Sequence, residues 1–206
     1  MIDNPKDLLL YLKNLNLLTN KPKFWWPNYG TFEVVIGAIL TQNTKWENVE
    51  RSLANLKGFL EFEDFLNIDV NFLKEYIRPS GFYNQKAVRL YNLAQNIKQD
   101  FETFSNFQDN VTREWLLNQK GIGFESADSI LCYACKREEF VVDSYTNRLL
   151  KSIGFEFESY DDIKYWIESG IRDSWDELKE YYEDNLNLCF ARFHGKIVEF
   201  SKRFDN

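Results

Sequence analysis

The stretch TREWLLNQKGIGFESADSILCYAC, residues 112–135, decides the fold of this chain. Thr112 can cap a helix that the Lys120–Gly123 turn ends, because two glycines one residue apart allow positive φ and close backbone approach. A second helix with an apolar face begins at once. The amides of residues 121–125 then lie at a helix N-terminus, which attracts an anion such as a DNA phosphate. A plain corner between two helices is the alternative.

Apolar residues recur at helical spacing over most of the chain. Three stripes show this pattern most clearly: 32–40, 90–101 and 127–134. Alternating strand patterns are missing, and EFVVD at 139–143 is too short to establish a strand. Breaks are predicted at 21–27, 78–81, 120–123 and 152–155. We therefore predict an all-α protein of about nine to eleven helices, from a mean helix length of about 11–12 residues.

Length and composition exclude several function classes. The 206 residues suffice for one large domain or two small lobes. A single histidine, His194, excludes zinc sites built on two or three histidines, and no phosphate-loop or dinucleotide glycine motif occurs. Three cysteines and an N-terminus without an apolar core predict a reducing cytoplasm and no signal peptide. No apolar run approaches the ~20 residues of a membrane span.

The net charge of −7 argues against a nucleic-acid binder. Charge is segregated, however, because residues 156–168 and 173–184 are acidic whereas 190–203 is basic. Such runs are ordinarily solvated faces. Their segregation nevertheless permits a local surface that faces phosphates.

A second informative stretch is VVDSYTNRLL, residues 141–150, in which Asp143 precedes an amphipathic run. Taken alone, Asp143 is predicted to be an N-cap. Taken with the glycine hairpin, it resembles the helix-hairpin-helix and catalytic-aspartate signature of the endonuclease III superfamily of DNA base-excision glycosylases. FEVVIGAILTQNT at 32–44 and IRPSGFYNQKAVRL at 77–90 agree with that family in order and spacing. The FWWP and ARFHGK segments look most like bacterial 3-methyladenine DNA glycosylases of the endonuclease III type.

The resemblance, which runs from about residue 25 to 155, implies an all-α, two-lobed helix-hairpin-helix fold with the active-site cleft between the lobes. One lobe, 29–137, would carry the hairpin, and 1–28 with 138–206 would carry Asp143 and the C-terminal tail. The implied activity is monofunctional: an alkylated purine, above all 3-methyladenine, is flipped out and excised, which leaves an abasic site. Damaged double-stranded DNA is the implied partner of a monomer that binds no membrane and works in the cytoplasm, at the nucleoid.

The resemblance also implies roles for single residues. Asp143 would stabilise oxocarbenium charge and orient water. Aromatic faces would stack on a cationic base, and the predicted pocket is Trp25, Trp26, Pro27, Trp46 and Glu125. Gln42 and Phe82 match the family's wedge positions, and the full set of predicted DNA contacts is Gln42, Phe82, Asn84, Lys86, Lys120, Gly121 and Gly123. Each assignment has a structural alternative. The FWWP segment would be a buried aromatic cluster, Phe82 would be a core phenylalanine, and Lys86 and Lys120 would be solvated surface lysines.

The chain departs from the bifunctional members of the family at Glu125, where they carry a nucleophilic lysine. A carboxylate cannot form an imine, so we predict base release without lyase activity. Endonuclease III ends in four cysteines that hold an iron–sulfur cluster, whereas only Cys189 lies in that region here. We therefore expect no cluster and no required cofactor.

Three groups of residues could stabilise the fold in other ways. A structural Na⁺ or K⁺ could bind the carbonyls of Leu117, Gln119 and Ile122, as the resemblance implies. A polar network is expected among Arg192, Lys196 and Glu199. A metal site on Cys132, Cys135, Cys189 and His194 is conceivable, although such cysteines usually only pack.

Other functions remain open at this point. They are a bifunctional glycosylase/lyase for oxidised pyrimidines, a helix-hairpin-helix protein that binds DNA without catalysis, and a helical scaffold that does not bind DNA. The sequence does not rank 3-methyladenine against 7-methylguanine, ethenoadenine or hypoxanthine, because pocket dimensions decide that choice.

Overall fold

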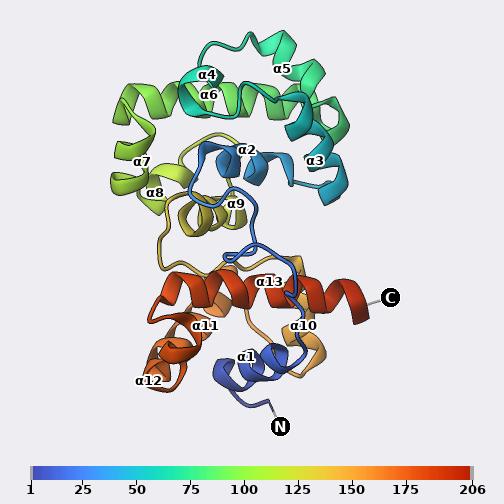
Figure 1. The fold of residues 1–206 in the computed structure, drawn as a ribbon, viewed down its shortest axis with the longest axis vertical. Coiled ribbons are helices and arrows are strands. Elements are labelled where there is room, and N and C mark those ends of the chain that lie inside the picture. The colour runs from blue at the N-terminus through green and yellow to red at the C-terminus, as the bar shows by residue number, and fades with distance from the viewer. Residues whose placement is uncertain (1, 205–206) are drawn as a thin grey trace. The chain divides into compact units, whose positions relative to one another are not determined.

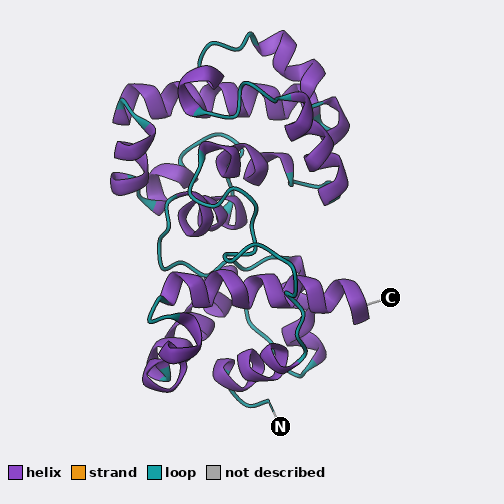
Figure 2. Cartoon of the chain, viewed as in Figure 1, coloured by secondary structure: helices purple, strands orange, loops and turns teal. Residues whose placement is uncertain are grey.

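The computed structural model describes residues 2–204, and within them every regular element is a helix (Figure 2). The chain divides into two compact units. One unit is Asn28–Lys136, and the other combines the chain up to Pro27 with the chain from Arg137 onward. These bounds lie one residue from the predicted division. The two units are described separately below.

The unit of residues 28–136 contains eight α-helices, a 3-10 turn and a π-helical turn. The α-helices are α2 (Phe32–Leu40), α3 (Trp46–Asn55), α4 (Phe62–Phe65), α5 (Val70–Tyr76), α6 (Tyr83–Phe101), α7 (Phe104–Asn110), α8 (Arg113–Leu117) and α9 (Phe124–Ser129). The 3-10 turn is Arg78–Ser80, and the π-helical turn, Ile130–Ala134, continues α9.

Helix α2 is the centre of this unit and lies between α6 and α9 (Figure 1). The predicted stripe on α2 is confirmed, but burial goes beyond one face. Every residue of α2 except Glu33 is buried, because helices cover it on several sides. Phe32, its first residue, meets the rings of Phe62, Phe65 and Phe104 edge-on at 5.2, 5.3 and 5.5 Å.

The described part of the other unit, residues 2–27 and 137–204, contains five α-helices and a 3-10 turn, Lys179–Tyr182. The α-helices are α1 (Pro5–Asn14), α10 (Ser144–Ser152), α11 (Tyr160–Asp173), α12 (Trp175–Leu178) and α13 (Leu186–Phe204). Helix α13 packs on α1 and α10 (Figure 1). Helices α1 and α11 approach closely because Gly170 has no side chain, and a Cβ there would lie 2.6 Å from Pro5.

The helix-turn-helix predicted at 112–135 is confirmed. Thr112 accepts a hydrogen bond from the Trp115 amide at 3.1 Å and caps α8. Gly121 adopts φ +85° in the turn, and Gly123 is the extended N-cap of α9. The positive φ at position 121 favours glycine, and a Cβ on Gly121, 2.3 Å from the Arg89 side chain, would force Arg89 to move.

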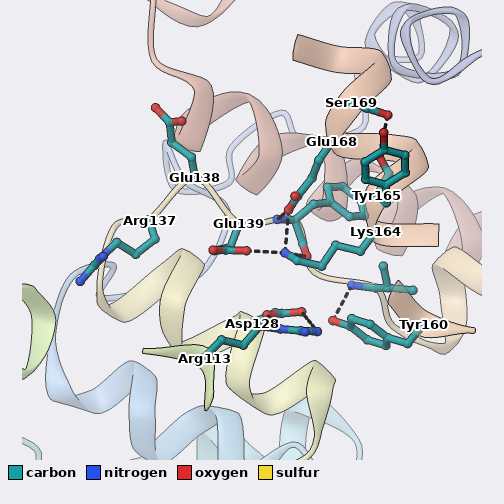
Figure 3. A network of polar contacts seen from close by, with 12 residues as sticks. Arg113, Asp128, Arg137, Glu138, Glu139, Tyr160, Lys164, Tyr165, Glu168 and Ser169 are labelled. Atoms are coloured by element: carbon teal, nitrogen blue, oxygen red, sulfur yellow. Dashed lines mark hydrogen bonds and ion pairs between the residues drawn. The ribbon is translucent and has the colours of Figure 1, made fainter. Parts of the chain in front are cut away.

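A buried ion pair joins the two helices of the hairpin. Arg113 at the start of α8 donates two hydrogen bonds, of 2.8 and 3.1 Å, to the carboxylate of Asp128 in α9 (Figure 3). Asp128 is fully buried. Two parallel bonds fix both angle and distance, so this pair sets the geometry of the hairpin.

The predicted count of helices is too low. The described residues contain thirteen α-helices, because elements such as α4 and α12 have only four residues each and are invisible to periodicity. The segment 139–143 forms no strand, as predicted. No helix within residues 2–204 has the length and apolar content needed to cross a membrane.

Asp128→Asn is expected to lower the free energy of unfolding by about 3 kcal/mol, because it removes the charge of a fully buried carboxylate that Arg113 binds through two hydrogen bonds. Urea unfolding followed by circular dichroism measures this loss. Glu63→Gln is the matched control, since it breaks the exposed 3.4 Å pair with Lys98, and about 0.5 kcal/mol or less is expected there. Equal losses in the two variants would contradict the role given to Asp128.

Candidate functional site

Asp143 is the N-cap of α10, with φ −105° and ψ −177°. Its Oδ1 accepts hydrogen bonds from the Thr146 amide at 2.8 Å and from the Thr146 hydroxyl at 2.9 Å. Its Oδ2 lies 3.3 Å from Nε2 of His194 on α13. The predicted cap is therefore confirmed, and it does not compete with a catalytic role, because the cap uses the other carboxylate oxygen.

The environment of Asp143 keeps the carboxylate ionised. Burial raises the pKa of Asp143, but attraction to His194 and the hydrogen bonds from Thr146 lower it by more, so the pKa lies below its ordinary value. The side chain of Asp143 is only 11% exposed. A charged, almost dry carboxylate with fixed orientation can stabilise developing positive charge more strongly than one in water.

The extended segment that leads to Asp143 is held by three side chains of α11: Tyr160, Lys164 and Glu168 (Figure 3). The Phe140 amide donates to Glu168 at 2.7 Å, and Lys164 donates to the Phe140 carbonyl at 3.1 Å. The Val142 amide donates to the Tyr160 hydroxyl oxygen at 3.2 Å. The backbone before Asp143 is thus fixed although it belongs to no regular element.

Trp25 lies beside His194, the residue that contacts the carboxylate of Asp143. Its ring meets His194 edge-on at 5.1 Å and Trp26 at 6.1 Å. Trp25 has φ +67°, and its indole packs on Gly195, where a Cβ would lie 2.4 Å from the ring. Trp26 is buried with 7% exposure, and Pro27 is half-buried. Of the predicted pocket residues in this unit, Trp25 therefore contacts His194, the partner of Asp143.

Two other predicted pocket residues belong to the unit of residues 28–136. Trp46 is the first residue of α3 and is half-buried. Glu125 stands in the first turn of α9 and is exposed. Position 125 therefore carries a carboxylate where the bifunctional enzymes carry a nucleophilic lysine.

Gln42 is bound to the hairpin. Its amide nitrogen donates to the Gly121 carbonyl at 3.0 Å and to the Ser126 hydroxyl at 2.9 Å. Its amide oxygen accepts from Arg89 at 2.9 Å. Sequence reasoning missed Arg89, and no local signal announces it, because its contacts with the turn lie more than thirty residues away. Gln42 in this position braces the turn, and its predicted insertion into DNA stays a prediction.

Phe82 is an exposed aromatic in a strained position. It precedes α6 in the left-handed conformation, φ +47° and ψ +26°, and 65% of its surface is exposed. A bulky residue with positive φ is uncommon and concentrates at functional sites. Asn84 and Lys120 are also exposed, as contacts with DNA require.

The prediction that Lys86 contacts a phosphate is wrong, because this side chain is buried. It is 1% exposed, and its ammonium donates to the carbonyls of Leu40 and Ser80 at 2.8 Å each. Burial, with the nearby Arg89, lowers the pKa of Lys86 to about 8. Lys86 joins the end of α2 to the turn before α6, and it cannot reach a phosphate from there.

The three residues of the predicted network on α13 do not bond to one another, and each makes a polar contact with another part of the same unit. Arg192 donates to the Lys23 carbonyl at 3.0 Å, Lys196 lies 3.5 Å from the Tyr182 hydroxyl, and Glu199 pairs with Lys21 at 3.5 Å. Arg192 and Glu199 thus both reach the segment 21–23 after α1, and Lys196 reaches the 3-10 turn Lys179–Tyr182. Lys196 is buried, which with Arg192 lowers its pKa to about 7, so it adds nothing to a basic surface.

No metal site is apparent among the described residues. All three cysteines are buried, and no group of three or more His, Cys, Asp or Glu side chains there is arranged to hold an ion. At the predicted cation site, the Gln119 carbonyl accepts the Ile122 amide at 3.1 Å. Carbonyl oxygens are suitable ligands for hard cations, and the Na⁺ or K⁺ site stays a prediction.

The low pKa of Asp143 predicts how stability depends on pH. A depressed carboxyl pKa contributes stability above the unfolded value of about 3.9, and this contribution is lost as pH falls through the folded value. The wild-type protein should therefore exceed Asp143→Asn in melting temperature at pH 7, and the difference should shrink below about pH 4. Thermal unfolding of both proteins from pH 3 to pH 7 measures this, and a difference independent of pH would contradict it.

A family model described as HhH-GPD superfamily base excision DNA repair protein matches residues 36–171. This range includes the hairpin, Asp143 and most of α11. Among solved structures, the H. pylori 3-methyladenine DNA glycosylase (MagIII) bound to 1,N6-ethenoadenine is similar to this chain with a TM-score of 0.94 and 49% identity, over 98% of each chain.

Two further relatives extend the comparison. A Methanocaldococcus jannaschii protein, provisionally named a DNA repair glycosylase, is 43% identical over 190 residues, which cover 87% of this chain and 80% of the relative. Endonuclease III of Thermotoga maritima is 24% identical over 174 residues, which cover 84% of this chain and 73% of that protein.

Proposed function

The chain belongs to the HhH-GPD superfamily of base excision DNA repair proteins, and from that membership we propose that it is a monofunctional DNA glycosylase that excises alkylated purines. The observation that carries this proposal is the buried carboxylate of Asp143, charged and fixed at the start of α10. The similar H. pylori protein is named for 3-methyladenine, and we extend that substrate to this chain.

The reaction breaks the bond between C1′ of the sugar and the base nitrogen. The bonding electrons leave with the base, so an N3-alkylated adenine departs as a neutral molecule and positive charge builds on the sugar. The carboxylate of Asp143 stabilises that charge and orients a water, whose oxygen adds to C1′. The same carboxylate accepts the proton that this water loses. The products are the free base and an abasic site, and the chemistry requires no cofactor.

A positively charged base is recognised by aromatic faces, because their quadrupole attracts a cation. We assign this task to the rings of Trp25 and Trp26, with Pro27 as an apolar neighbour, and such a surface selects for charge and flat shape. Trp46 and Glu125, which belong to the other unit, stay predicted pocket residues. The proposed substrate is double-stranded DNA, in which the damaged base must leave the stack before it can react. The proposed enzyme acts as a monomer at the nucleoid.

Contacts with DNA are assigned to exposed groups of the unit 28–136. Phe82 fills the gap left by the flipped base, since an intercalated ring partly replaces the lost stacking. Asn84, Lys120 and the amides of Gly121 and Gly123 bind phosphates without reading sequence. This mode of binding suits a chain with a net charge of −7, because it depends on a few local groups.

The exposed carboxylate of Glu125 favours hydrolysis over lyase chemistry. Strand cleavage by bifunctional enzymes begins with an amine that attacks C1′ and forms an imine. A carboxylate at this position cannot do so, which makes the bifunctional alternative the second candidate.

Incubation with freshly methylated duplex DNA tests the proposal. We expect free 3-methyladenine by chromatography, with strands that stay intact until alkali cleaves them at the abasic sites. Borohydride should trap no covalent complex between protein and DNA. A trapped imine would replace the monofunctional assignment by the bifunctional one, and no base release with binding to abasic duplex retained would leave a DNA-binding protein.

Phe82→Ala is expected to weaken binding to a duplex with an abasic-site analogue by roughly 10-fold, because stacking of one base on an aromatic side chain is worth about 1–3 kcal/mol. Phe72→Ala is the matched control, since Phe72 in α5 is also 65% exposed and has no assigned contact with DNA. Fluorescence anisotropy measures both affinities. Similar affinities for the two variants would remove the wedge role from Phe82.

A further inference from the structure

His194 is the single histidine of the chain and lies on α13, where it is 4% exposed. Its Nε2 is 3.3 Å from Oδ2 of Asp143. Its ring meets Trp25 edge-on at 5.1 Å and Phe140 at 6.3 Å. One side chain thus contacts the proposed catalytic carboxylate, a proposed pocket wall and the segment that leads to the carboxylate.

The two oxygens of Asp143 are held by different elements. Thr146 of α10 itself donates to Oδ1, as an N-cap requires. His194 approaches Oδ2 from α13. A carboxylate held at one oxygen can still rotate about its Cβ–Cγ bond, whereas one held at both oxygens cannot. The long-range contact from α13 therefore completes what the local cap leaves free.

We propose that His194 is a positioning residue for base excision: its Nε2, 3.3 Å from Oδ2 of Asp143, holds that oxygen by electrostatic attraction, and its ring supports Trp25. This inference rests on the proposed glycosylase function. A carboxylate oxygen is attracted only by a donor or a positive charge, so His194 acts on Oδ2 through an Nε2 that carries a proton. A fixed carboxylate needs no reorganisation as positive charge develops on the sugar, and displacements of about 1 Å can cost roughly 10²-fold in rate.

The neighbouring residue supports the same arrangement. Gly195 follows His194 on α13, and the indole of Trp25 occupies the space that a Cβ at position 195 would need. The pair His194–Gly195 therefore seats Trp25 with one ring contact and one backbone contact. The ARFHGK segment thereby acquires a physical explanation for two of its residues.

Two variants separate the donor of His194 from its ring. His194→Gln keeps an N–H donor the same number of bonds from Cα as Nε2, but it has no ring. His194→Phe keeps a ring against Trp25, but it has no donor. Single-turnover base release from methylated duplex measures the rate constant, and anisotropy on abasic duplex measures affinity.

We expect His194→Phe to lower the rate constant by about 10²-fold, and His194→Gln to stay within about 5-fold of wild type. Affinity for abasic duplex should change by less than about 2-fold in both, because His194 is buried and acts through Asp143. Melting temperatures of both variants show whether they fold. Equal rates in the two variants, or a loss confined to affinity, would overturn the inference.

A measurement independent of activity uses the imidazole resonances, which belong to one residue because the chain has one histidine. The C–H shifts of His194 should change in Asp143→Asn and stay unchanged in Glu63→Gln, which removes a carboxylate that has no contact assigned to His194. Identical His194 C–H shifts in wild type and Asp143→Asn would overturn the proposed contact. If the wild type released no base while this coupling was present, the proposed function would fail and the Asp143–His194 contact would stand.

Discussion

A buried carboxylate is tolerated in a protein only where hydrogen bonds and opposite charge replace the water it has lost. Asp143 meets this condition with Thr146 on one oxygen and His194 on the other. The surrounding unit is built to provide these partners: α11 fixes the approach of the chain, α10 supplies the cap, and α13 brings His194 to the same point. The proposed chemistry depends on this arrangement, because the negative charge acts on the sugar only if it stays ionised, desolvated and still.

The unit of residues 28–136 uses the same physical principle for a structural purpose. Asp128 is fully buried and binds Arg113 with two hydrogen bonds, which join the helices of the hairpin. Gln42 and Arg89 then brace the glycine turn from outside it. A hairpin held in this way presents its backbone amides in a fixed orientation. Each unit thus contains a buried, hydrogen-bonded aspartate, Asp143 in one and Asp128 in the other, that the apolar periodicity of the sequence does not predict.

Features set by neighbouring residues could be predicted from the sequence. The helices at 32–40 and 90–101, the caps by Thr112 and Asp143, and the glycine turn all follow from local propensity and spacing. Features set by distant contacts could not. Nothing in the sequence around Lys86 distinguishes it from a surface lysine. Its structural role depends on the distant Leu40 carbonyl and the Ser80 carbonyl, to which its ammonium donates. His194 is 51 residues from Asp143, so nothing in either segment announces their contact.

The most direct measurement of the central claim is the single-turnover rate of base release by Asp143→Asn on methylated duplex DNA, compared with wild type at equal saturation. Asparagine keeps an oxygen for the cap but removes the charge. The account predicts a loss of about 10²-fold or more in rate with affinity for abasic duplex retained, since the charge stabilises the transition state and not the bound DNA. A variant that released base at nearly the wild-type rate would contradict it.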